Sequence, residues 1–326
     1  MKIAIVGATG EVGRMMITCL AEFNLPVSQL DLYASERSEG MILYYVDKPL
    51  VVHALDESSL LKHYDYVLFS AGAGVARSFA PIALAACEVV IDNSSAFRRE
   101  ANIPLVVPEV NGDQVVGYNG IIANPNCSTI QLILPLAVLD RLFGLTKVVA
   151  STYQAVSGSG HKGILALQDQ RQGSSDKGIY PELIDLNVIP QIGGFLDNGY
   201  CQEEDKMHFE TRKILRKENI AISTTTVRVP VVHGHSIAVY AEFEREVDLA
   251  EAAKALKNSP SIVFSENTFF TPLKLGNSND SQVCRLRYGT DKHSLAFWNV
   301  AHNVRLGAAT NAIRILMLHA KAAGLL

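Results

Sequence analysis

Short apolar runs recur through the first half of the chain, and each is followed by glycines or small polar residues. They consist mainly of aliphatic and aromatic residues and lie at 2–6, 30–34, 66–69 and 89–91. Runs of this kind predict strands buried on both faces, as in a parallel sheet. The stretches 14–23 and 75–87 between them are predicted to be helices. Strands that alternate with helices predict an α/β fold with a Rossmann-type nucleotide-binding domain.

Beyond residue 146 the regular alternation ends. Strands are predicted at 147–153, 221–232, 237–243 and 297–300, and helices at 203–215, at 248–258 and from 304 to the C-terminus. The stretch 161–199 is polar, with glycines and prolines, and is predicted to be an irregular excursion or interface loop. Pro135 is predicted to kink or end the helix that starts near residue 127. This mixture is typical of an α+β domain.

The length of the chain predicts two domains, because 326 residues exceed what one core ordinarily holds. We expect a nucleotide-binding domain at 1–125, completed by a C-terminal helix at 304–326, and a second domain at 126–303. That terminal helix carries an apolar face and is expected to pack back on the nucleotide-binding domain.

Composition and charge exclude several classes of protein. With 48% hydrophobic and 19% charged residues and a net charge of -4, the chain has the balance of a soluble globular protein and no electrostatic reason to bind nucleic acid. We expect no signal peptide and no membrane-spanning segment. Five scattered cysteines without a CxxC pair predict a reducing, cytoplasmic environment. His233 and His235 lack further ligands at metal-site spacing, so no metal is expected.

Three glycines follow the first predicted strand in the sequence GATGEVG at 7–13. This is a variant of the dinucleotide-binding turn, although any tight strand-to-helix turn can use glycines. Its position between the first strand and the first helix favours a nucleotide. A second small-residue loop follows the strand at 66–69. The residues expected to contact the cofactor in these two loops are Gly7, Ala8, Thr9, Gly10, Glu11, Val12, Ser70, Ala71 and Gly72.

Opposing signals for cofactor choice follow the second strand. Ser35, Arg37 and Ser38 can bind the 2′-phosphate of NADP, whereas Glu36 or Glu39 would favour the ribose hydroxyls of NAD. We expect NADP.

Cys127 is the candidate nucleophile. It lies between small polar residues and directly precedes the apolar run 130–134, which predicts a helix start. A helix N-terminus favours an anion and lowers a thiol pKa, and the thiolate is the reactive form. The alternative is a small buried hydrophobic residue. The polar neighbours argue against burial.

Four other side chains are candidates for the same chemistry. Gln154, at a strand end, can bind a substrate or thioester oxygen, and Arg98 follows a polar turn where a phosphate or carboxylate can bind. One histidine can serve as acid or base beside the cysteine. Arg228 and His235 can reach one pocket only if a turn at Gly234 redirects the chain.

These stretches together resemble aspartate-semialdehyde dehydrogenase over nearly the whole chain. The motifs that carry the resemblance are GATGEVG at 7–13, SSAFR at 94–98, NPNCST at 124–129, YQAVSGSG at 153–160, EEDKMHFETRKIL at 203–215, RVPVVHGHS at 228–236 and NVRLGAATNA at 303–312. NPNCST together with YQAVSGSG is highly specific, whereas the glycine motif alone is not.

The resemblance implies roles for particular residues and makes 126–303 a catalytic and dimerisation domain. It implies Cys127 as nucleophile, His235 as general acid/base, Gln154 as the group that orients the intermediate, and Asn126 as an assistant at the acyl site. Substrate contacts are implied for Arg98, Gln154, Ser157, Glu203, Lys206 and Arg228, the phosphate being bound by Arg98 and Lys206. Further cofactor contacts are implied for Ser157, Gly158 and Asn303.

The implied reaction is NADPH-dependent reduction of L-4-aspartyl phosphate, with release of inorganic phosphate, by a homodimer in lysine, threonine and methionine biosynthesis. The nearest alternative enzyme is N-acetyl-glutamyl-phosphate reductase. Glu203 and Arg228 favour a free amino acid, whose ammonium and carboxylate need partners of opposite sign. A catalytically silent binding paralogue is the alternative of another class. Such a paralogue would lack Cys127 or His235, and both are present.

Overall fold

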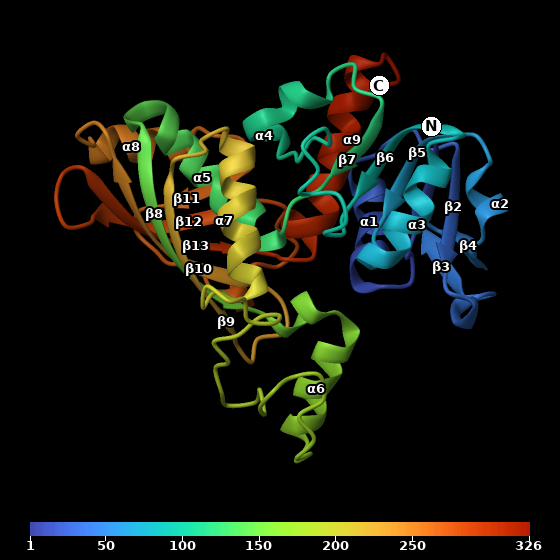
Figure 1. Cartoon of the computed structure of the whole chain (residues 1–326), viewed down its shortest axis with the longest axis horizontal. Coiled ribbons are helices and arrows are strands. Elements are labelled where there is room, and N and C mark those ends of the chain that lie inside the picture. Colours follow the sequence, from blue (N-terminus) through green and yellow to red (C-terminus); the bar gives the residue numbers. More distant parts are fainter. The chain divides into compact units, whose positions relative to one another are not determined.

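A computed structural model describes residues 1–326, which divide into two compact units (Figure 1). Unit 1 comprises Met1–Asn126 and Ala308–Leu326, and unit 2 comprises Cys127–Gly307. No helix of either unit has both the length and the apolar composition that crossing a bilayer requires.

Unit 1 is built on a seven-stranded sheet of order β3-β4-β2-β1-β5-β6-β7, parallel except at the β3–β4 pair. Its strands are β1 Lys2–Val6, β2 Gln29–Ala34, β3 Ile42–Tyr45, β4 Lys48–Ala54, β5 Tyr64–Phe69, β6 Cys87–Asp92 and β7 Gly120–Ala123. The predicted parallel sheet is confirmed. The patterns of β3, β4 and β7 gave no prediction. The strand order reverses at β1, the place where such sheets bind ligands.

Helices cover both faces of this sheet. They are α1 Glu11–Glu22, α2 Glu57–Leu60, α3 Ala73–Ala83, α4 Pro108–Asn111 and α9 Asn311–Ala322, with 3-10 turns η1 Glu36–Ser38 and η2 Gly112–Val115. Alternate residues of β1 enter different cores: Ile3 and Ile5 pack with α1 and α9, and Ala4 and Val6 pack with α3. The prediction that the terminal helix packs on this unit is therefore confirmed. The predicted helix at 75–87 is too long, because Cys87 already belongs to β6.

Unit 2 is built on a six-stranded sheet of order β11-β12-β13-β10-β8-β9. Its strands are β8 Leu145–Gln154, β9 Ala221–Arg228, β10 His235–Phe243, β11 Ile262–Ser265, β12 Ser281–Tyr288 and β13 Ser294–Ala301. Helices α5 Cys127–Phe143, α7 Gln202–Leu215 and α8 Leu249–Lys257 pack against the sheet. Short turns complete it: η3 Val156–Ser159, η4 Pro272–Lys274 and a π-helical turn η5 Arg305–Thr310.

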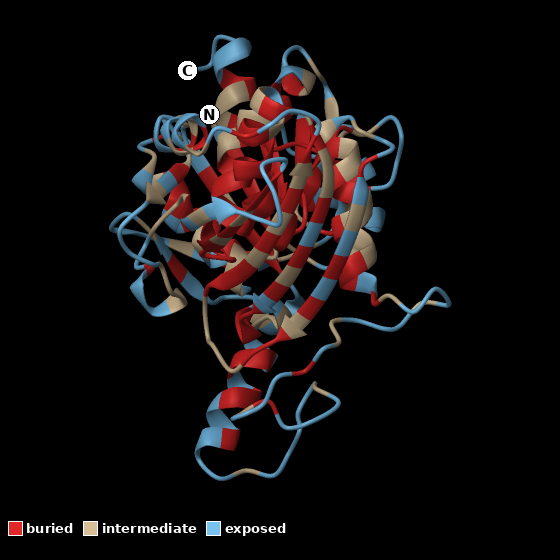
Figure 2. Ribbon diagram, turned by 90° about the vertical axis from the view of Figure 1, so that its left-hand side faces the viewer, coloured by how far each residue is buried: buried red, intermediate tan, exposed pale blue.

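Two predictions for unit 2 are wrong in detail, and the prediction for Pro135 is narrowed. The stretch 161–199 is not irregular throughout, since α6 spans His161–Arg171 and packs Ile164 and Leu167 into a small separate core. Figure 2 shows buried positions along α6, while the chain that follows it is mostly exposed. β9 ends at Arg228, two residues before Pro230, because proline cannot donate to a ladder. α5 continues past Pro135 to Phe143, so the helix does not end there, and a kink at Pro135 stays a prediction.

Candidate active site

The glycine turn of unit 1 borders a cavity of about 530 Å³, within the usual range for a small-molecule site. Gly7 has a φ of +85°, and a Cβ there would lie 2.9 Å from the backbone of Ser70 and Ala71. A Cβ on Gly13 would lie 2.2 Å from the Gly7 oxygen. Both glycines are therefore required by the tight packing of β1, α1 and the loop after β5.

The cavity lining contains about half of the predicted cofactor residues of unit 1. These are Gly7, Thr9, Gly10, Ser35, Arg37, Ser70 and Ala71. Ala8, Glu11, Val12, Ser38 and Gly72 do not line it, although the Ser38 hydroxyl lies 3.4 Å from that of Thr9. Glu36 lines the cavity beside Arg37, so both residues follow the second strand where the ribose of a dinucleotide is expected. The glycine turn, cavity and donors fit a nicotinamide dinucleotide.

Arg98 is buried just beyond the carboxyl end of β6, where its Nη2 donates to the Asn93 carbonyl at 2.9 Å. Sequence analysis did not single out Asn93. Both polar atoms of its side-chain amide are buried and have no hydrogen-bond partner in the chain. Buried amides are ordinarily satisfied, so Asn93 is a candidate ligand contact next to Arg98. A polar residue directly after a central parallel strand was the available signal.

In unit 2, Cys127 is the first residue of α5 and is partly exposed. The predicted helix start is thus confirmed, and the thiol lies where the helix presents unpaired N–H groups. Gly307 packs directly on this residue, because a Cβ at Gly307 would lie 2.6 Å from the Cys127 Cβ and 3.0 Å from its Cα. This close approach was not predicted, because no local sequence pattern indicates it. Asn126 belongs to unit 1 and is buried.

His235 is fully buried at the start of β10, and its Nδ1 accepts a hydrogen bond from the Ala155 N–H at 3.0 Å. Burial, then the charges of Arg228 and His302, hold the pKa of His235 well below its ordinary value. The ring is therefore neutral near pH 7. Since Nδ1 is an acceptor, the single ring proton is on Nε2. Nε2 is buried and has no protein partner, so this N–H is available to a substrate or a sulfur.

The turn at Gly234 brings Arg228 and His235 to one place. Gly234 has a φ of +94°, which redirects the chain between β9 and β10. A Cβ on Gly158 would lie 2.8 Å from Arg228 Nη1 and 3.3 Å from His235 Cε1. Arg228 Nη1 also donates to the Ala155 carbonyl at 2.6 Å. The backbone of one residue thus holds both side chains: the N–H of Ala155 binds the histidine and its carbonyl binds the arginine.

Glu203 and Gln154 join this cluster. Gln154 is the register partner of Arg228 across the parallel pair of β8 and β9. Its Nε2 donates to Glu203 Oε1 at 3.3 Å, and Lys206 Nζ lies 3.2 Å from Glu203 Oε2. Glu203, Gln154 and Arg228 are all buried, so the site holds a buried cation and a buried anion around one amide.

Ser157 and Asn303 are linked to each other rather than exposed to solvent. Asn303 Nδ2 donates to Ser157 Oγ at 2.9 Å, and its Oδ1 accepts from the Gly234 N–H at 2.9 Å. The Asn303 side chain is therefore already engaged in fixing the turn that positions His235. His302 beside it stacks on His233, with ring centroids 5.3 Å apart.

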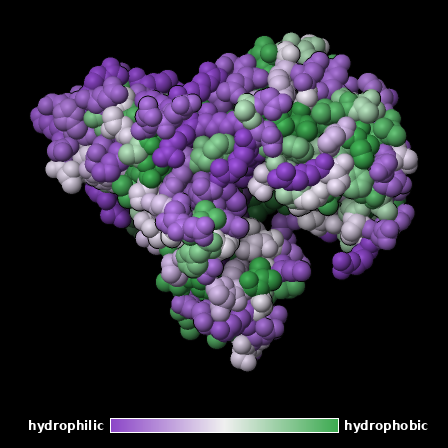
Figure 3. Space-filling model, viewed as in Figure 1, coloured by the Kyte–Doolittle hydropathy of each residue, from purple (hydrophilic) through white to green (hydrophobic).

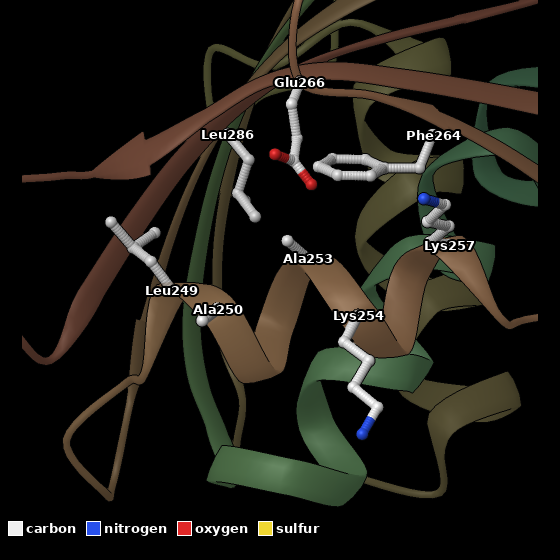
Figure 4. A pocket seen from close by; sticks show the side chains of 8 residues that line it. All are labelled: Leu249, Ala250, Ala253, Lys254, Lys257, Phe264, Glu266 and Leu286. Atoms are coloured by element: carbon white, nitrogen blue, oxygen red, sulfur yellow. The ribbon is translucent and has the colours of Figure 1, made fainter.

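Two further cavities of unit 2 differ in chemistry. The lining of a cavity of about 530 Å³ includes Arg228, Ser159, Tyr180 and residues 191–194, so the excursion borders the same cavity as Arg228. Another, of about 540 Å³, lies between α8, β11 and β12 (Figure 4). Leu286 and Phe264 border it, and Figure 4 shows Lys254 pointing away from it. No predicted site residue lines the second cavity.

A nucleotide-sized cavity beside a glycine turn in one unit, and a cysteine at a helix start in the other, fit the class of dehydrogenases that use a thiol nucleophile. The comparisons with known proteins agree. Residues 2–118 match the model described as "Semialdehyde dehydrogenase, NAD binding domain", and residues 135–306 match "Semialdehyde dehydrogenase, dimerisation domain".

The chain belongs to the aspartate-semialdehyde dehydrogenase family. It is 44% identical to that enzyme from Aquifex aeolicus, with 98% of each chain covered, and 39% identical to the one from Bacillus subtilis, with 97% of this chain and 96% of the relative covered. A crystal structure of aspartate semialdehyde dehydrogenase II from Vibrio cholerae complexed with ASA superimposes with a TM-score of 0.94, at 39% identity and with 98% of each chain covered.

Proposed function

We propose that this protein catalyses the NADPH-dependent reduction of L-4-aspartyl phosphate to L-aspartate 4-semialdehyde through a thioester on Cys127, a step of amino-acid biosynthesis. The observation that carries the proposal is the buried cluster of Arg228, Gln154 and Glu203 beside the Nε2–H of His235, in the unit whose α5 starts at Cys127. We further propose that unit 1 is the nucleotide-binding domain and unit 2 the catalytic and dimerisation domain.

Substrate recognition follows from the two buried charges. Arg228 presents a planar fork that suits the α-carboxylate, and Glu203 supplies a negative charge for the α-ammonium. Lys206 and Arg98 are the proposed phosphate ligands, and Asn93 is a candidate neighbour. An N-acetylated substrate has no ammonium, so Glu203 would gain no charged partner from it beyond its contacts with Lys206 and Gln154. This difference favours aspartyl phosphate over N-acetyl-glutamyl phosphate.

The chain's own groups then carry the covalent steps. The Cys127 thiolate attacks the acyl carbon, the C–O bond to phosphate breaks, and inorganic phosphate leaves with the bonding pair. NADPH, when bound in unit 1, would supply the hydride that takes the thioester to the aldehyde level. The carbon–sulfur bond then breaks, the sulfur keeps the bonding pair as a thiolate, and the His235 Nε2–H donates a hydrogen bond that stabilises it. Gln154 donates an amide N–H to the acyl oxygen and orients it.

The fixed tautomer of His235 makes it first a donor. Because its Nδ1 accepts from Ala155, a neutral ring cannot also present an unprotonated Nε2 to the thiol. We propose that the Nε2–H stabilises the attacking thiolate and, after hydride transfer, the departing one.

The cofactor proposal rests on the cavity lining of unit 1. Ser35 and Arg37 can bind a 2′-phosphate, and the guanidinium adds charge. Glu36 lies on the same lining and is the residue that would favour NAD instead. NADP is the proposed cofactor.

A homodimer is proposed from the match of unit 2 to a dimerisation domain and from its exposed apolar residues. The excursion after α6 carries large hydrophobic residues that are at least one-third exposed: Ile179, Leu183, Leu186, Val188 and Phe195. Figure 3 shows hydrophobic residues interspersed with hydrophilic ones on this part of the surface. We propose that a second copy of the chain buries these hydrophobic residues in the dimer. A cytoplasmic location is proposed because all five cysteines are free.

The test is phosphate-dependent reduction of NADP by aspartate semialdehyde, compared with N-acetyl-glutamate semialdehyde. Activity with the first substrate alone is expected. Cys127→Ser should abolish turnover, and mass spectrometry of the wild type should find an acyl adduct on Cys127. An adduct on Cys19, Cys87, Cys201 or Cys284, with Cys127 unmodified, would refute the proposal. Activity on the N-acetylated substrate alone would identify the alternative enzyme.

A further inference from the structure

The helix that starts at Cys127 is tied to the strand that starts at His235 by one buried amide. Gln131 lies four residues after Cys127, and so on the same face of α5. Its side chain is fully buried, and its Nε2 donates to the His235 carbonyl at 3.2 Å and to Asn299 Oδ1 at 2.8 Å. Gln131 therefore connects α5 with β10 and β13.

Pro135 explains a second connection, between α5 and β12. A proline has no N–H, so it removes the helical hydrogen bond that residue 135 would donate to the carbonyl of Gln131. The Ser281 hydroxyl donates to that carbonyl at 3.1 Å. Asn299 Nδ2 donates in turn to the Ser281 oxygen at 2.6 Å. The continuation of α5 past Pro135 is thus compensated from β12.

These bonds form a closed ring. It runs from the Gln131 amide to Asn299, from Asn299 to Ser281, and from Ser281 back to the Gln131 carbonyl. All three residues are fully buried. Removing one partner leaves another buried polar group unsatisfied, so the ring favours one relative position of α5, β12 and β13 over others. Apolar packing alone would not discriminate as sharply between small shifts.

We propose that Gln131, with Ser281 and Asn299, is a positioning network that sets the place of His235 relative to Cys127. His235 is then held from both sides: its carbonyl by Gln131, and its Nδ1 by Ala155. The network touches neither the substrate charges at Arg228 and Glu203 nor the thiol itself. Its loss should weaken the stabilisation of the thiolate by the His235 Nε2–H and spare substrate binding. The inference rests on the proposed function of Cys127 and His235.

The decisive variant is Gln131→Met, which removes the amide and keeps the length of the side chain. We expect kcat to fall by roughly ten- to a hundredfold, the scale on which a displacement of about 1 Å between reacting groups acts. The KM values for aspartate semialdehyde and NADP should stay within about twofold of wild type, because the binding groups are untouched. Iodoacetamide should alkylate Cys127 more slowly than in the wild type, because a displaced His235 Nε2–H stabilises the thiolate less.

Gln282→Met is the matched control. Gln282 is buried in β12 next to Ser281, and its side chain has no bond to His235. The same substitution there should leave kcat near wild type. Equal kcat losses for Gln131→Met and Gln282→Met, or a rise in KM that matches the fall in kcat, would overturn the proposal. An inactive wild type would instead refute the proposed function, so the two failures are distinguishable.

A double-mutant cycle of Ser281→Ala and Pro135→Ala tests the proposal if Gln131→Met does not fold. Ser281→Ala removes one hydroxyl and should lower kcat in the wild-type background. Pro135→Ala restores an N–H that can donate to the Gln131 carbonyl. In the Pro135→Ala background, the kcat loss caused by Ser281→Ala should therefore be smaller. Equal losses in the two backgrounds would show that the Ser281 bond to the carbonyl does not position the site.

Discussion

Gly307→Ala is the most direct test of whether the position of Cys127 limits the reaction. The added methyl would lie 2.6 Å from the Cys127 Cβ, whereas carbon atoms pack at about 3.5–4.0 Å. One of the two residues must therefore move by about 1 Å. The nearest atoms are the Cβ, Cα and carbonyl oxygen of Cys127, so a side-chain rotation cannot relieve the contact. The movement falls on the nucleophile or on the turn that faces it.

Gly307→Ala is expected to lower both the stability of the protein and its turnover rate. Overpacking of this kind destabilises a protein by about 1–3 kcal/mol, which a folded enzyme of this size should survive. A 1 Å displacement of a reacting group can lower the rate by about a hundredfold. We therefore expect Gly307→Ala to fold with a reduced Tm, and to lose kcat by roughly one to two orders of magnitude while KM for the semialdehyde changes little.

The assay is phosphate-dependent NADP reduction, combined with the rate of Cys127 alkylation followed by mass spectrometry. Gly74→Ala is the matched control, because a Cβ at Gly74 would have no neighbour within 4 Å and its φ is not positive. That variant should retain wild-type kcat. A folded Gly307→Ala enzyme with kcat within about twofold of wild type would refute the reasoning. The rate loss expected for a displacement of about 1 Å would then not have occurred.

Three more outcomes follow from the site. Arg228→Lys should damage turnover and leave NADPH affinity nearly unchanged, since a lysine cannot reproduce a bidentate contact; equal losses of both would place Arg228 in the fold or the cofactor site. Arg37→Ala should weaken NADPH relative to NADH by at least roughly tenfold, as expected for loss of a charge-assisted hydrogen bond; equal losses in equilibrium titrations would point to Glu36 and NAD. Burial, with His233 and Arg305, lowers the pKa of His302 to about 4. Protonation of His302 therefore favours the unfolded state as pH falls from about 6.5, the ordinary histidine value, to about 4. Between these pH values, urea unfolding should show a smaller loss of stability in His302→Asn than in the wild type. Equal losses in the two proteins would exclude His302 as a source of the pH dependence.

Much of the site could be anticipated from local signals. The position of Cys127 at a helix start follows from polar residues before an apolar run, and α5 does start there. The glycine turn was predicted from its place between a strand and a helix, and the packing around Gly7 and Gly13 gives its physical reason. The roles of Gln154, Glu203 and Arg228 remain predictions, although the structure brings the three together.

Other features could not be predicted because they join distant parts of the chain. The Gln131–Asn299 bond spans 168 residues, and the Gln131–Ser281 bond spans 150. A mid-helix proline predicted a kink or an end, since the hydroxyl that compensates for it belongs to a strand far along the sequence. The same limit applies to Asn93 and Gly307, whose importance depends on what packs around them.

The sequence by itself determined the alternation of strands and helices, the glycine turn and the start of the nucleophile helix. Each depends on residues within a few positions of one another, because periods of 2 and 3.6 and helix capping act over short distances. Only the tertiary structure decided the tautomer of His235, its low pKa and its meeting with Arg228 at the Ala155 peptide. Burial and hydrogen bonding set those properties, and both arise when β8, β9 and β10 pair.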